Sequence, residues 1–212
     1  MRPSVYSPLN SSAFFMIQQR QKLFRKILAK HCSGVDSVRF LEIGCGNGQW
    51  LAEFQMFGLR VGNMYGIELD PERANEASGR IAGADIQVGN AAKLPWDDGF
   101  FDIVFQSTVF TSILDSSVRE KAAEEMKRVC KPNGIVLWYD FIYDSPSNAN
   151  VRGVAKREIV ELFSPWKVNY QKTTLAPPIA RRTVPLSWLF SEMLEAFCPF
   201  LRTHAVAVIT KS

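Results

Sequence analysis

One stretch decides the fold of this 212-residue chain: Leu41-Glu42-Ile43-Gly44-Cys45-Gly46-Asn47-Gly48. The apolar run 38–43 predicts a strand, which breaks at once into three alternating glycines, and a helical pattern follows over 49–57. Glycine allows a tight turn with positive φ and lets a ligand touch the backbone. The start of a helix offers free N–H donors. The stretch therefore predicts a ligand-binding turn between a strand and a helix, although a plain strand–helix turn would explain the glycines equally well.

The next strand along the chain, predicted over 63–69, places Glu68 twenty residues after Gly48. A carboxylate at this point can bind both hydroxyls of a ribose. Dinucleotides and S-adenosylmethionine are both bound in this way. The dinucleotide fingerprint is GxGxxG, whereas the third glycine here comes one place early and Gln49 follows it.

Strands and helices alternate through the middle of the chain, which predicts an α/β fold with a parallel sheet covered by helices on both faces. The predicted elements after residue 69 are a helix over 71–82, strands over 85–88 and 102–107, a helix over 119–129, a turn over 131–134 and a strand over 135–141. A further helix is predicted over 154–163, a strand over 166–174, a loop with prolines and arginines, a helix over 186–197 and a strand over 203–210. A helix over 11–31 precedes them all.

We expect one domain over 1–212, made of an N-terminal helical cap (1–36), a cofactor-binding core (38–141) and an acceptor-side segment that completes the sheet (142–212). Hydrophobic residues make up 47% and charged residues 22% of the chain, as in ordinary globular proteins. The chain has no apolar window long enough for a membrane span and no signal-peptide pattern. Its four cysteines and two histidines are scattered, so we expect neither a metal site nor a disulfide framework. These features predict a cytoplasmic protein.

Several further motifs follow the glycine loop in order: Gly89-Asn90-Ala91, Leu94-Pro95, Phe101-Asp102-Ile103-Val104 and Lys131-Pro132-Asn133-Gly134. Together with the loop and Glu68, they resemble the class I S-adenosylmethionine-dependent methyltransferases over residues 38–141. The resemblance implies a Rossmann-like, seven-stranded, mostly parallel sheet whose antiparallel last strand lies between the fifth and sixth. It also implies S-adenosylmethionine as the cofactor and S-adenosylhomocysteine as its product.

The resemblance also implies roles for individual residues. Those expected at the cofactor are Glu42, Gly44, Cys45, Gly46, Gly48, Glu68, Leu69, Asn90, Ala91 and Gln106. Glu68 would bind the ribose hydroxyls, Leu69 and the 90–91 pair would contact the adenine, and Gln106 would lie beside the sulfonium. Asn90 departs from the usual Asp, but its amide oxygen can still accept a hydrogen bond. Three of these residues also have a plain structural interpretation: Glu42 as a support for the loop, Leu69 as core, and Cys45 as a small residue in a crowded turn.

The acceptor is expected where the parallel strands end, because ligands bind at that edge of an open α/β sheet. Tyr139, Asp140 and Tyr143 leave the fifth strand there, and Arg181, Arg182, Arg202 and His204 belong to segments that reach the same edge. His204 is a candidate general base because its ordinary pKa is near neutrality, and Asp140 is a second catalytic candidate. Tyr139 and the three arginines are candidates for acceptor binding. The arginines would otherwise be solvated charges, and His204 a spacer.

The segment after residue 139 resembles methyltransferases of bacterial polysaccharide and glycan biosynthesis. This likeness implies O-methylation of a sugar or other small acceptor, on a nucleotide or lipid carrier. The whole net charge of +4 lies in residues 141–212, which hold 9 basic and 5 acidic side chains. We therefore expect an anionic acceptor or carrier. We expect no nucleic-acid partner, because the basic residues are not clustered with aromatic ones.

Other interpretations stay open at this stage. The chain could bind S-adenosylmethionine without catalysis, as a regulatory or partner subunit, or it could be a dinucleotide-dependent oxidoreductase. The N-terminal helix could close over the cofactor, with Tyr6 or Arg20 binding the cofactor carboxylate. The helix over 186–197 would first be expected to pack in the core, but it could also form a dimer face or touch a membrane, so an oligomer is not excluded.

Overall fold

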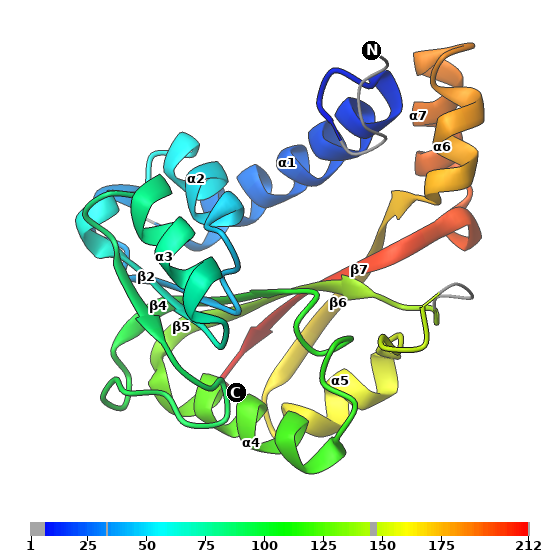
Figure 1. Ribbon diagram of the computed structural model, residues 1–212. Coiled ribbons are helices and arrows are strands. Elements are labelled where there is room, and N and C mark those ends of the chain that lie inside the picture. The colour runs from blue at the N-terminus through cyan, green and yellow to red at the C-terminus, as the bar shows by residue number, and fades with distance from the viewer. Residues whose placement is uncertain (1–6, 33, 145–147, 212) are drawn as a thin grey trace.

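A seven-stranded sheet forms the centre of the computed structural model, which describes residues 7–32, 34–144 and 148–211 (Figure 1). The strands are β1 (Phe40–Ile43), β2 (Met64–Glu68), β3 (Asp85–Val88), β4 (Phe101–Ser107), β5 (Cys130–Phe141), β6 (Lys167–Leu175) and β7 (Arg202–Thr210). Their order is β3-β2-β1-β4-β5-β7-β6. The first five pair in parallel, and β7 pairs antiparallel with both β5 and β6. The predicted Rossmann-like sheet, with its antiparallel last strand between the fifth and sixth, is confirmed.

Helices cover both faces of the sheet, as predicted (Figure 1). They are α1 (Ser11–His31), α2 (Gln49–Met56), α3 (Pro71–Arg80), α4 (Ser116–Val129), α5 (Lys156–Leu162), α6 (Pro177–Thr183) and α7 (Trp188–Phe197), with short 3₁₀ turns η1 (Val35–Ser37), η2 (Val61–Asn63) and η3 (Pro199–Leu201). One hydrophobic core lies between the sheet and helices α1, α2 and α3, and a second lies between the sheet and helices α4 and α5. The central strands are buried on both faces and are therefore almost uniformly apolar.

Helix α1 bridges two parts of the molecule. In its C-terminal half, Phe24 packs on Trp50, Phe54, Phe105 and Tyr139, with ring centroids 5.3 to 5.8 Å away. In its N-terminal half, Phe15 packs edge-on against Trp188 of α7 at 5.0 Å. The helix thus connects α2 and the central strands to the α6–α7 pair. This pair extends beyond β6 and β7 in Figure 1.

Two predicted connections are wrong. Residues 177–183, expected as a loop, form α6, because Pro177 and Pro178 occupy the first helical turn, where proline is tolerated. The turn expected over 131–134 lies within β5, which begins at Cys130. There the register against β4 shifts between Phe101 and Ile103, so the proline and glycine are accommodated as a bulge.

Within the described residues, none of the helices combines the length and the apolar character that crossing a membrane would require.

Candidate functional site

The glycine loop, residues 44–48, joins β1 to α2 at the carboxyl edge of the sheet, where the parallel strands end. Gly44, Gly46 and Gly48 have φ of +63°, +54° and +78°, in the region that glycine favours. A Cβ on Gly44 would lie 2.6 Å from Val109 Cγ2, and one on Gly48 would lie 3.2 Å from Ala77 Cα. The loop therefore depends on glycine both for its backbone conformation and for close packing.

Glu68 lies beside this loop at the end of β2 and is buried. Its Oε2 accepts a hydrogen bond from the Gly46 amide at 2.8 Å, and its Oε1 accepts one from the Asp70 amide at 3.1 Å. Arg73 of α3 has Nη1 at 4.0 Å from Glu68 Oε1, and its guanidinium lies over Gly46. The carboxylate is thus fixed at the loop, and the exposed Arg73 side chain is the group that a ligand there would displace.

Glu42 is a buried acid in the middle of β1. Burial raises the pKa of its carboxyl well above the usual range; the Leu51 amide acts in the opposite direction, and Glu68 and Glu53 raise it further. Its Oε2 has no hydrogen-bond partner among the described residues. A buried carboxyl oxygen without a partner is costly, which makes Glu42 Oε2 a candidate for contact with a positively charged or hydrogen-bond-donating ligand.

Cys45 is buried in the loop against β2. A Cβ on Gly66 would lie 2.8 Å from Cys45 Sγ, so the thiol fills the space that this glycine leaves. Burial raises its pKa to about 12. A thiol with such a pKa is protonated at neutral pH and is a poor nucleophile, so a packing role fits Cys45 better than a chemical one.

The residues expected at the adenine follow β2 and β3. Leu69 is 70% exposed, so it is not a core residue and has a free apolar surface at the carboxyl edge. Asn90 Oδ1 accepts a hydrogen bond from the Ala92 amide at 2.9 Å, and Ala91 is half-buried. Asn90 thus stabilises its own turn, as Asn commonly does, while its oxygen keeps a second lone pair for a ligand.

Gln106 and Asp140 lie together at the ends of β4 and β5, and both are buried. Gln106 Oε1 accepts a hydrogen bond from the Val109 amide at 3.1 Å. Asp140 accepts from the Phe141 amide at 2.8 Å and from the Thr111 amide at 3.3 Å. Burial raises the pKa of Asp140 to about 6, although these hydrogen bonds act against the rise. Asp140 is therefore a carboxylate at neutral pH that can still take up a proton.

His204 and Tyr139 form an aromatic stack on the other face of the sheet. Their rings lie 5.1 Å apart and nearly parallel, and Phe141 lies 4.1 Å from the histidine ring. Burial, together with the charge of Arg20, lowers the pKa of His204 to about 4. His204 pairs with Phe141, and the neighbouring Asp140 is turned to the opposite face. The two catalytic candidates therefore reach the same edge of the sheet from opposite faces and do not contact each other.

Arg20 extends from α1 toward this stack. Its Nη2 lies 2.9 Å from Glu53 Oε2, and its guanidinium lies 4.3 Å from the centre of the Trp50 ring. The burial of Tyr139 raises the pKa of its hydroxyl, and Arg20 lowers it. The sequence suggested Arg20, but it carried no signal for Trp50 or Glu53, because α1 and α2 meet only in the folded chain. Tyr6, the other candidate on the N-terminal segment, lies outside the described residues.

Two strained threonines flank Tyr139. Thr108 and Thr174 have φ of +57° and +65°, which is rare for a β-branched residue. The Thr108 amide donates to the Tyr139 carbonyl at 3.1 Å, and the Thr174 and Tyr139 hydroxyls lie 3.1 Å apart. Strain of this kind concentrates at functional sites. Nothing in the residue types could have predicted it.

The three candidate arginines do not converge on one point. Arg202 donates hydrogen bonds to the carbonyls of Lys172, Glu195 and Ala196, so it holds the end of α7 against β6. Arg181 and Arg182 lie exposed in the last turn of α6, at the end of that helix away from β6. Tyr143 is exposed, with its hydroxyl 3.4 Å from Lys172 Nζ.

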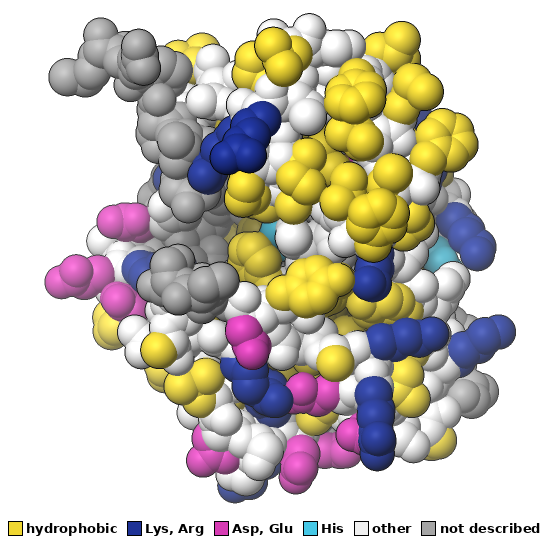
Figure 2. Space-filling model, turned by 90° about the vertical axis from the view of Figure 1, so that its right-hand side faces the viewer, with side chains coloured by type: hydrophobic (Ala, Val, Ile, Leu, Met, Phe, Trp, Pro, Cys, Tyr) yellow, Lys and Arg dark blue, Asp and Glu magenta, His cyan; other side chains and the backbone are white. Residues whose placement is uncertain are grey.

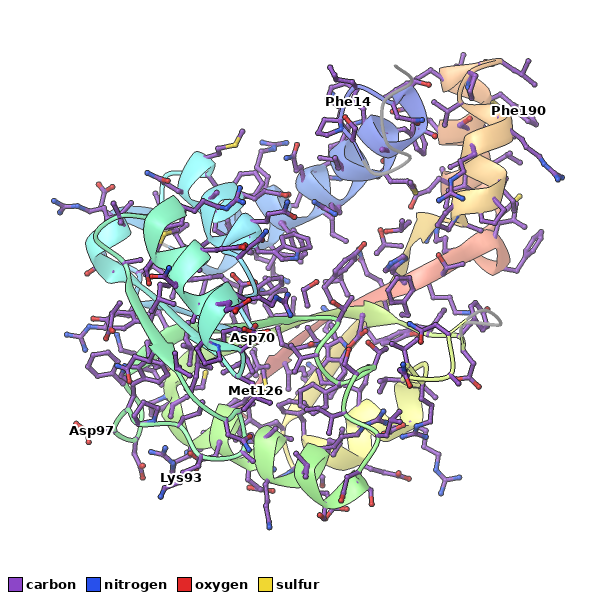
Figure 3. The ribbon with its side chains drawn as sticks, viewed as in Figure 1. Phe14, Asp70, Lys93, Asp97, Met126 and Phe190 are labelled. Carbon is purple, nitrogen blue, oxygen red and sulfur yellow. The ribbon has the colours of Figure 1, made fainter. Side chains whose placement is uncertain are left out.

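The groups around the glycine loop fit S-adenosylmethionine. Glu68 suits the ribose hydroxyls. The buried Glu42 and the half-buried Glu53 suit the cationic methionine end, since Glu42 Oε2 and Glu53 Oε1 have no hydrogen-bond partners among the described residues. Arg20 suits the cofactor carboxylate. Asp70, labelled in Figure 3, caps α3 beside Glu68 and accepts from the Glu72 and Arg73 amides.

Comparison with known proteins supports this interpretation. Residues 41–138 match the family model described as a methyltransferase domain. A demethylmenaquinone methyltransferase from Staphylococcus aureus is 27% identical over 135 residues, which cover 62% of this chain and 54% of that protein. The chain spans little more than half the length of the curated relatives it matches.

Solved structures show the same fold. A protein from Pyrococcus horikoshii OT3 superposes with a TM-score of 0.66 at 15% identity, covering 98% of this chain and 95% of that one. An S-adenosylmethionine-dependent methyltransferase from Archaeoglobus fulgidus superposes with a TM-score of 0.62 at 13% identity, covering 93% of this chain and 98% of that one.

Proposed function

We propose that this protein is an enzyme that transfers a methyl group from S-adenosylmethionine to a small acceptor bound at the carboxyl edge of the sheet. The observation that carries the proposal is the glycine loop, whose three positive-φ glycines surround a fixed Glu68 above the buried Glu42. The matching family model and the fold support it. The glycine loop alone would suit a dinucleotide equally well, but the motifs after it would not.

Bound S-adenosylmethionine supplies a methyl group on a sulfonium, which is already an electrophile. With Glu68 at its ribose and Arg20 at its carboxylate, the bound cofactor would offer this methyl group to the acceptor, and the electron pair of the broken carbon–sulfur bond would stay on the sulfur. The protein contributes alignment, for which effective molarities on the order of 10⁵ M or more are attainable. A hydroxyl acceptor also loses a proton, so a base nearby would assist.

Asp140 is the better of the two candidate bases. Its pKa is about 6, against about 4 for His204, and the group with the pKa nearer to neutrality accepts a proton more readily at neutral pH. His204 then serves as a neutral aromatic wall together with Tyr139. We propose that the acceptor lies near the end of β5, between these groups and the glycine loop.

Two acceptor classes are supported by different observations. O-methylation of a sugar on an anionic carrier stays a prediction from the resemblance of the C-terminal sequence and from its positive charge, with Arg20 nearest to the site and Arg181 and Arg182 farther out. The aromatic cluster at this edge, in which Tyr139 and His204 are buried and Trp50 is partly exposed, instead favours a flat ring such as a phenol or quinol. The name of the Staphylococcus aureus relative supports this second class as well.

A methyl-transfer screen would separate these possibilities. The enzyme would be incubated with cofactor carrying a labelled methyl group and with sugar nucleotides, lipid-linked sugars, phenols or quinols. We expect labelled product with one class, and a loss of product in the Asp140→Asn variant with unchanged cofactor binding. Cofactor binding without turnover on any acceptor, together with no effect of His204→Ala or Asp140→Asn, would instead support a non-catalytic binding subunit.

A further inference from the structure

Helix α7 turns its apolar side toward solvent. Leu189, Phe190, Met193 and Phe197 are each at least half exposed. Their spacing of one, four and eight residues places them along one side of the helix. Figure 3 labels Phe190 on this helix, at the end of the molecule away from the central strands.

The polar side of α7 faces the protein instead. Ser191 is fully buried, and its hydroxyl donates to Thr183 Oγ1 at 2.8 Å. Glu192 pairs with Lys22 of α1 at 2.8 Å, and Glu195 lies 3.6 Å from Arg202 Nε. One side of α7 thus packs against the protein, where Trp188 and Leu194 join the apolar cluster around Phe15 and the two acids form ion pairs. The other side leaves its apolar side chains exposed.

The exposed apolar surface extends beyond the helix. Leu186 before it and Phe200 in η3 are 84% and 72% exposed. We call the set Leu186, Leu189, Phe190, Met193, Phe197 and Phe200 the α7 face. Figure 2 shows a broad gathering of hydrophobic side chains over this end of the molecule, with Lys and Arg side chains at its margins and acidic ones mainly in the lower half of the view. A patch of this kind marks an interaction site.

The charges beside the α7 face are positive. The two acids of this segment, Glu192 and Glu195, are each paired with a base. Arg181 and Arg182 lie exposed on α6, and neither has an ion-pair partner within residues 7–32, 34–144 and 148–211. Helix α6 packs against α7, so the unpaired arginines stand on the neighbouring helix. An apolar surface with basic side chains at its margins complements an apolar layer covered by anions.

We propose that the α7 face docks on an anionic membrane surface, with its aromatic side chains among the acyl chains and with Arg181 and Arg182 on the lipid headgroups. Interfacial binding combines buried apolar area with attraction to anionic lipids in this way. A second copy of the chain fits the charges less well, because a two-fold interface repeats the same patch and brings two pairs of arginines together.

Docking on this face would also bear on the reaction. Helix α6 follows directly on β6 at the carboxyl edge, and α1 is joined to α7 through Phe15 and Trp188. The candidate site at the ends of β4 and β5 is thus connected to the α7 face through α6 and through α1. A lipid-borne acceptor follows from this geometry, and that step alone rests on the proposed function.

Co-sedimentation of the 212-residue protein with vesicles tests the docking without cofactor or acceptor. The vesicles would be phosphatidylcholine alone, or phosphatidylcholine with about 30% phosphatidylglycerol, a content that gives the surface a negative potential. We expect binding to the anionic vesicles that weakens with salt. Phe190→Ser/Phe197→Ser should weaken it about tenfold or more, through lost apolar burial. Arg181→Gln/Arg182→Gln should weaken it about fivefold for each arginine removed.

Met56→Ser/Leu114→Ser is the matched control, since it removes two exposed apolar side chains elsewhere and should bind as the wild type does. Circular dichroism would confirm that all variants fold. Absence of binding by the wild type, or equal binding by the Phe190/Phe197 and control variants, would overturn the proposal. The proposal would also be overturned if the wild type binds no vesicles but forms a dimer in sedimentation velocity, and if Phe190→Ser/Phe197→Ser abolishes that dimer. A wild-type protein that binds the vesicles but does not bind S-adenosylhomocysteine would overturn the proposed function and leave the docking proposal standing.

Discussion

Gly44 carries the tightest constraint in the cofactor loop. Its φ is +63°, and a Cβ there would lie 2.6 Å from Val109 Cγ2. We expect Gly44→Ala to lower the free energy of unfolding by about 1–3 kcal/mol, as for other strained backbones, and to weaken cofactor binding. Gly79→Ala is the control: its Cβ meets nothing within 4 Å, and it should stabilise α3 by up to about 1 kcal/mol. Urea unfolding measures both, and equal effects would contradict the account.

Glu68 is the residue whose charge the cofactor should need most. In Glu68→Gln one side-chain oxygen remains to accept a hydrogen bond from a backbone N–H. The charged oxygen that would accept hydrogen bonds from the ribose hydroxyls is gone. Because hydrogen bonds to charged groups contribute about 1.5–3 kcal/mol, we expect the dissociation constant for S-adenosylhomocysteine to rise about 10- to 100-fold. Glu76→Gln, on the exposed side of α3, should leave it unchanged. Normal binding by Glu68→Gln would mean that the ribose lies elsewhere.

His204 and Asp140 should give the stability opposite dependences on pH. Burial lowers the pKa of His204 to about 4, from an ordinary value of 6.5. Its contribution to the free energy of unfolding is therefore fully present above pH 6.5 and is lost as the pH falls toward 4. Burial raises the pKa of Asp140 to about 6, from an ordinary value of 3.8. Its contribution to the free energy of unfolding is therefore fully present below pH 3.8 and is lost as the pH rises through 6. Each amounts to about 3 kcal/mol, so in the wild type the two nearly cancel.

Replacing one of these two residues should therefore reveal the pH dependence that the other gives to the stability. Asp140→Asn should lose thermal stability on acidification from about pH 7 to about pH 4.5, relative to the wild type, because the effect of His204 remains. His204→Gln should gain stability over the same range. Differential scanning calorimetry of the two variants at both pH values measures this, and shifts of the same sign in both would contradict the environments described.

Residue types predicted part of this site. The glycines, Glu68 and Gln106 lie at the predicted strand ends, because the backbone chemistry of a strand–glycine–helix turn is local. Their roles toward a cofactor stay predictions. The partners of Arg202 and the position of Arg20 could not be predicted, because they depend on which helix ends lie nearby in the folded chain. The strain at Thr108 and Thr174 likewise comes from tertiary packing.

At the scale of elements, one buried aromatic side chain, Phe24, fixes the C-terminal half of α1 to the sheet and α2. Phe24 is buried among four other rings, whereas Phe14 on the same helix is 42% exposed. Phe24→Ala should cost about 3–5 kcal/mol of unfolding free energy, as for large core truncations. Phe14→Ala should cost less than about 1 kcal/mol. Urea unfolding of both variants measures the difference, and similar costs would mean that α1 does not pack through Phe24.

The helices and strands with strong hydrophobic periodicity were predicted within a few residues, and α6 was not. A Pro-Pro pair predicts a break in the chain unless helix-forming residues follow it closely. Here Ile179 and Ala180 follow, and Ala180 packs with Phe15 and Leu175, so tertiary contacts decide for a helix. The exposure of the apolar side chains at 189, 190, 193 and 197 was likewise not visible in the sequence of α7, because periodicity gives the sides of a helix but not which side meets the rest of the protein.

At the scale of the whole molecule, the sheet brings together segments far apart in sequence. The order β3-β2-β1-β4-β5-β7-β6 sets the cofactor loop and Glu68 on one half of the carboxyl edge, and Tyr139, Asp140 and His204 on the other. The positive charge of residues 141–212 was expected to mark the acceptor site. Two of its arginines instead border the α7 face, and a third holds α7 in place.

Titration calorimetry tests the central claim most directly, with the wild-type protein and two ligands, S-adenosylhomocysteine and NAD. The account predicts a single saturable site for S-adenosylhomocysteine on each chain and no detectable heat with NAD, because the loop, Glu68 and the buried acids suit a ribose joined to a cationic amino acid. Saturable binding of NAD with none of S-adenosylhomocysteine would contradict it.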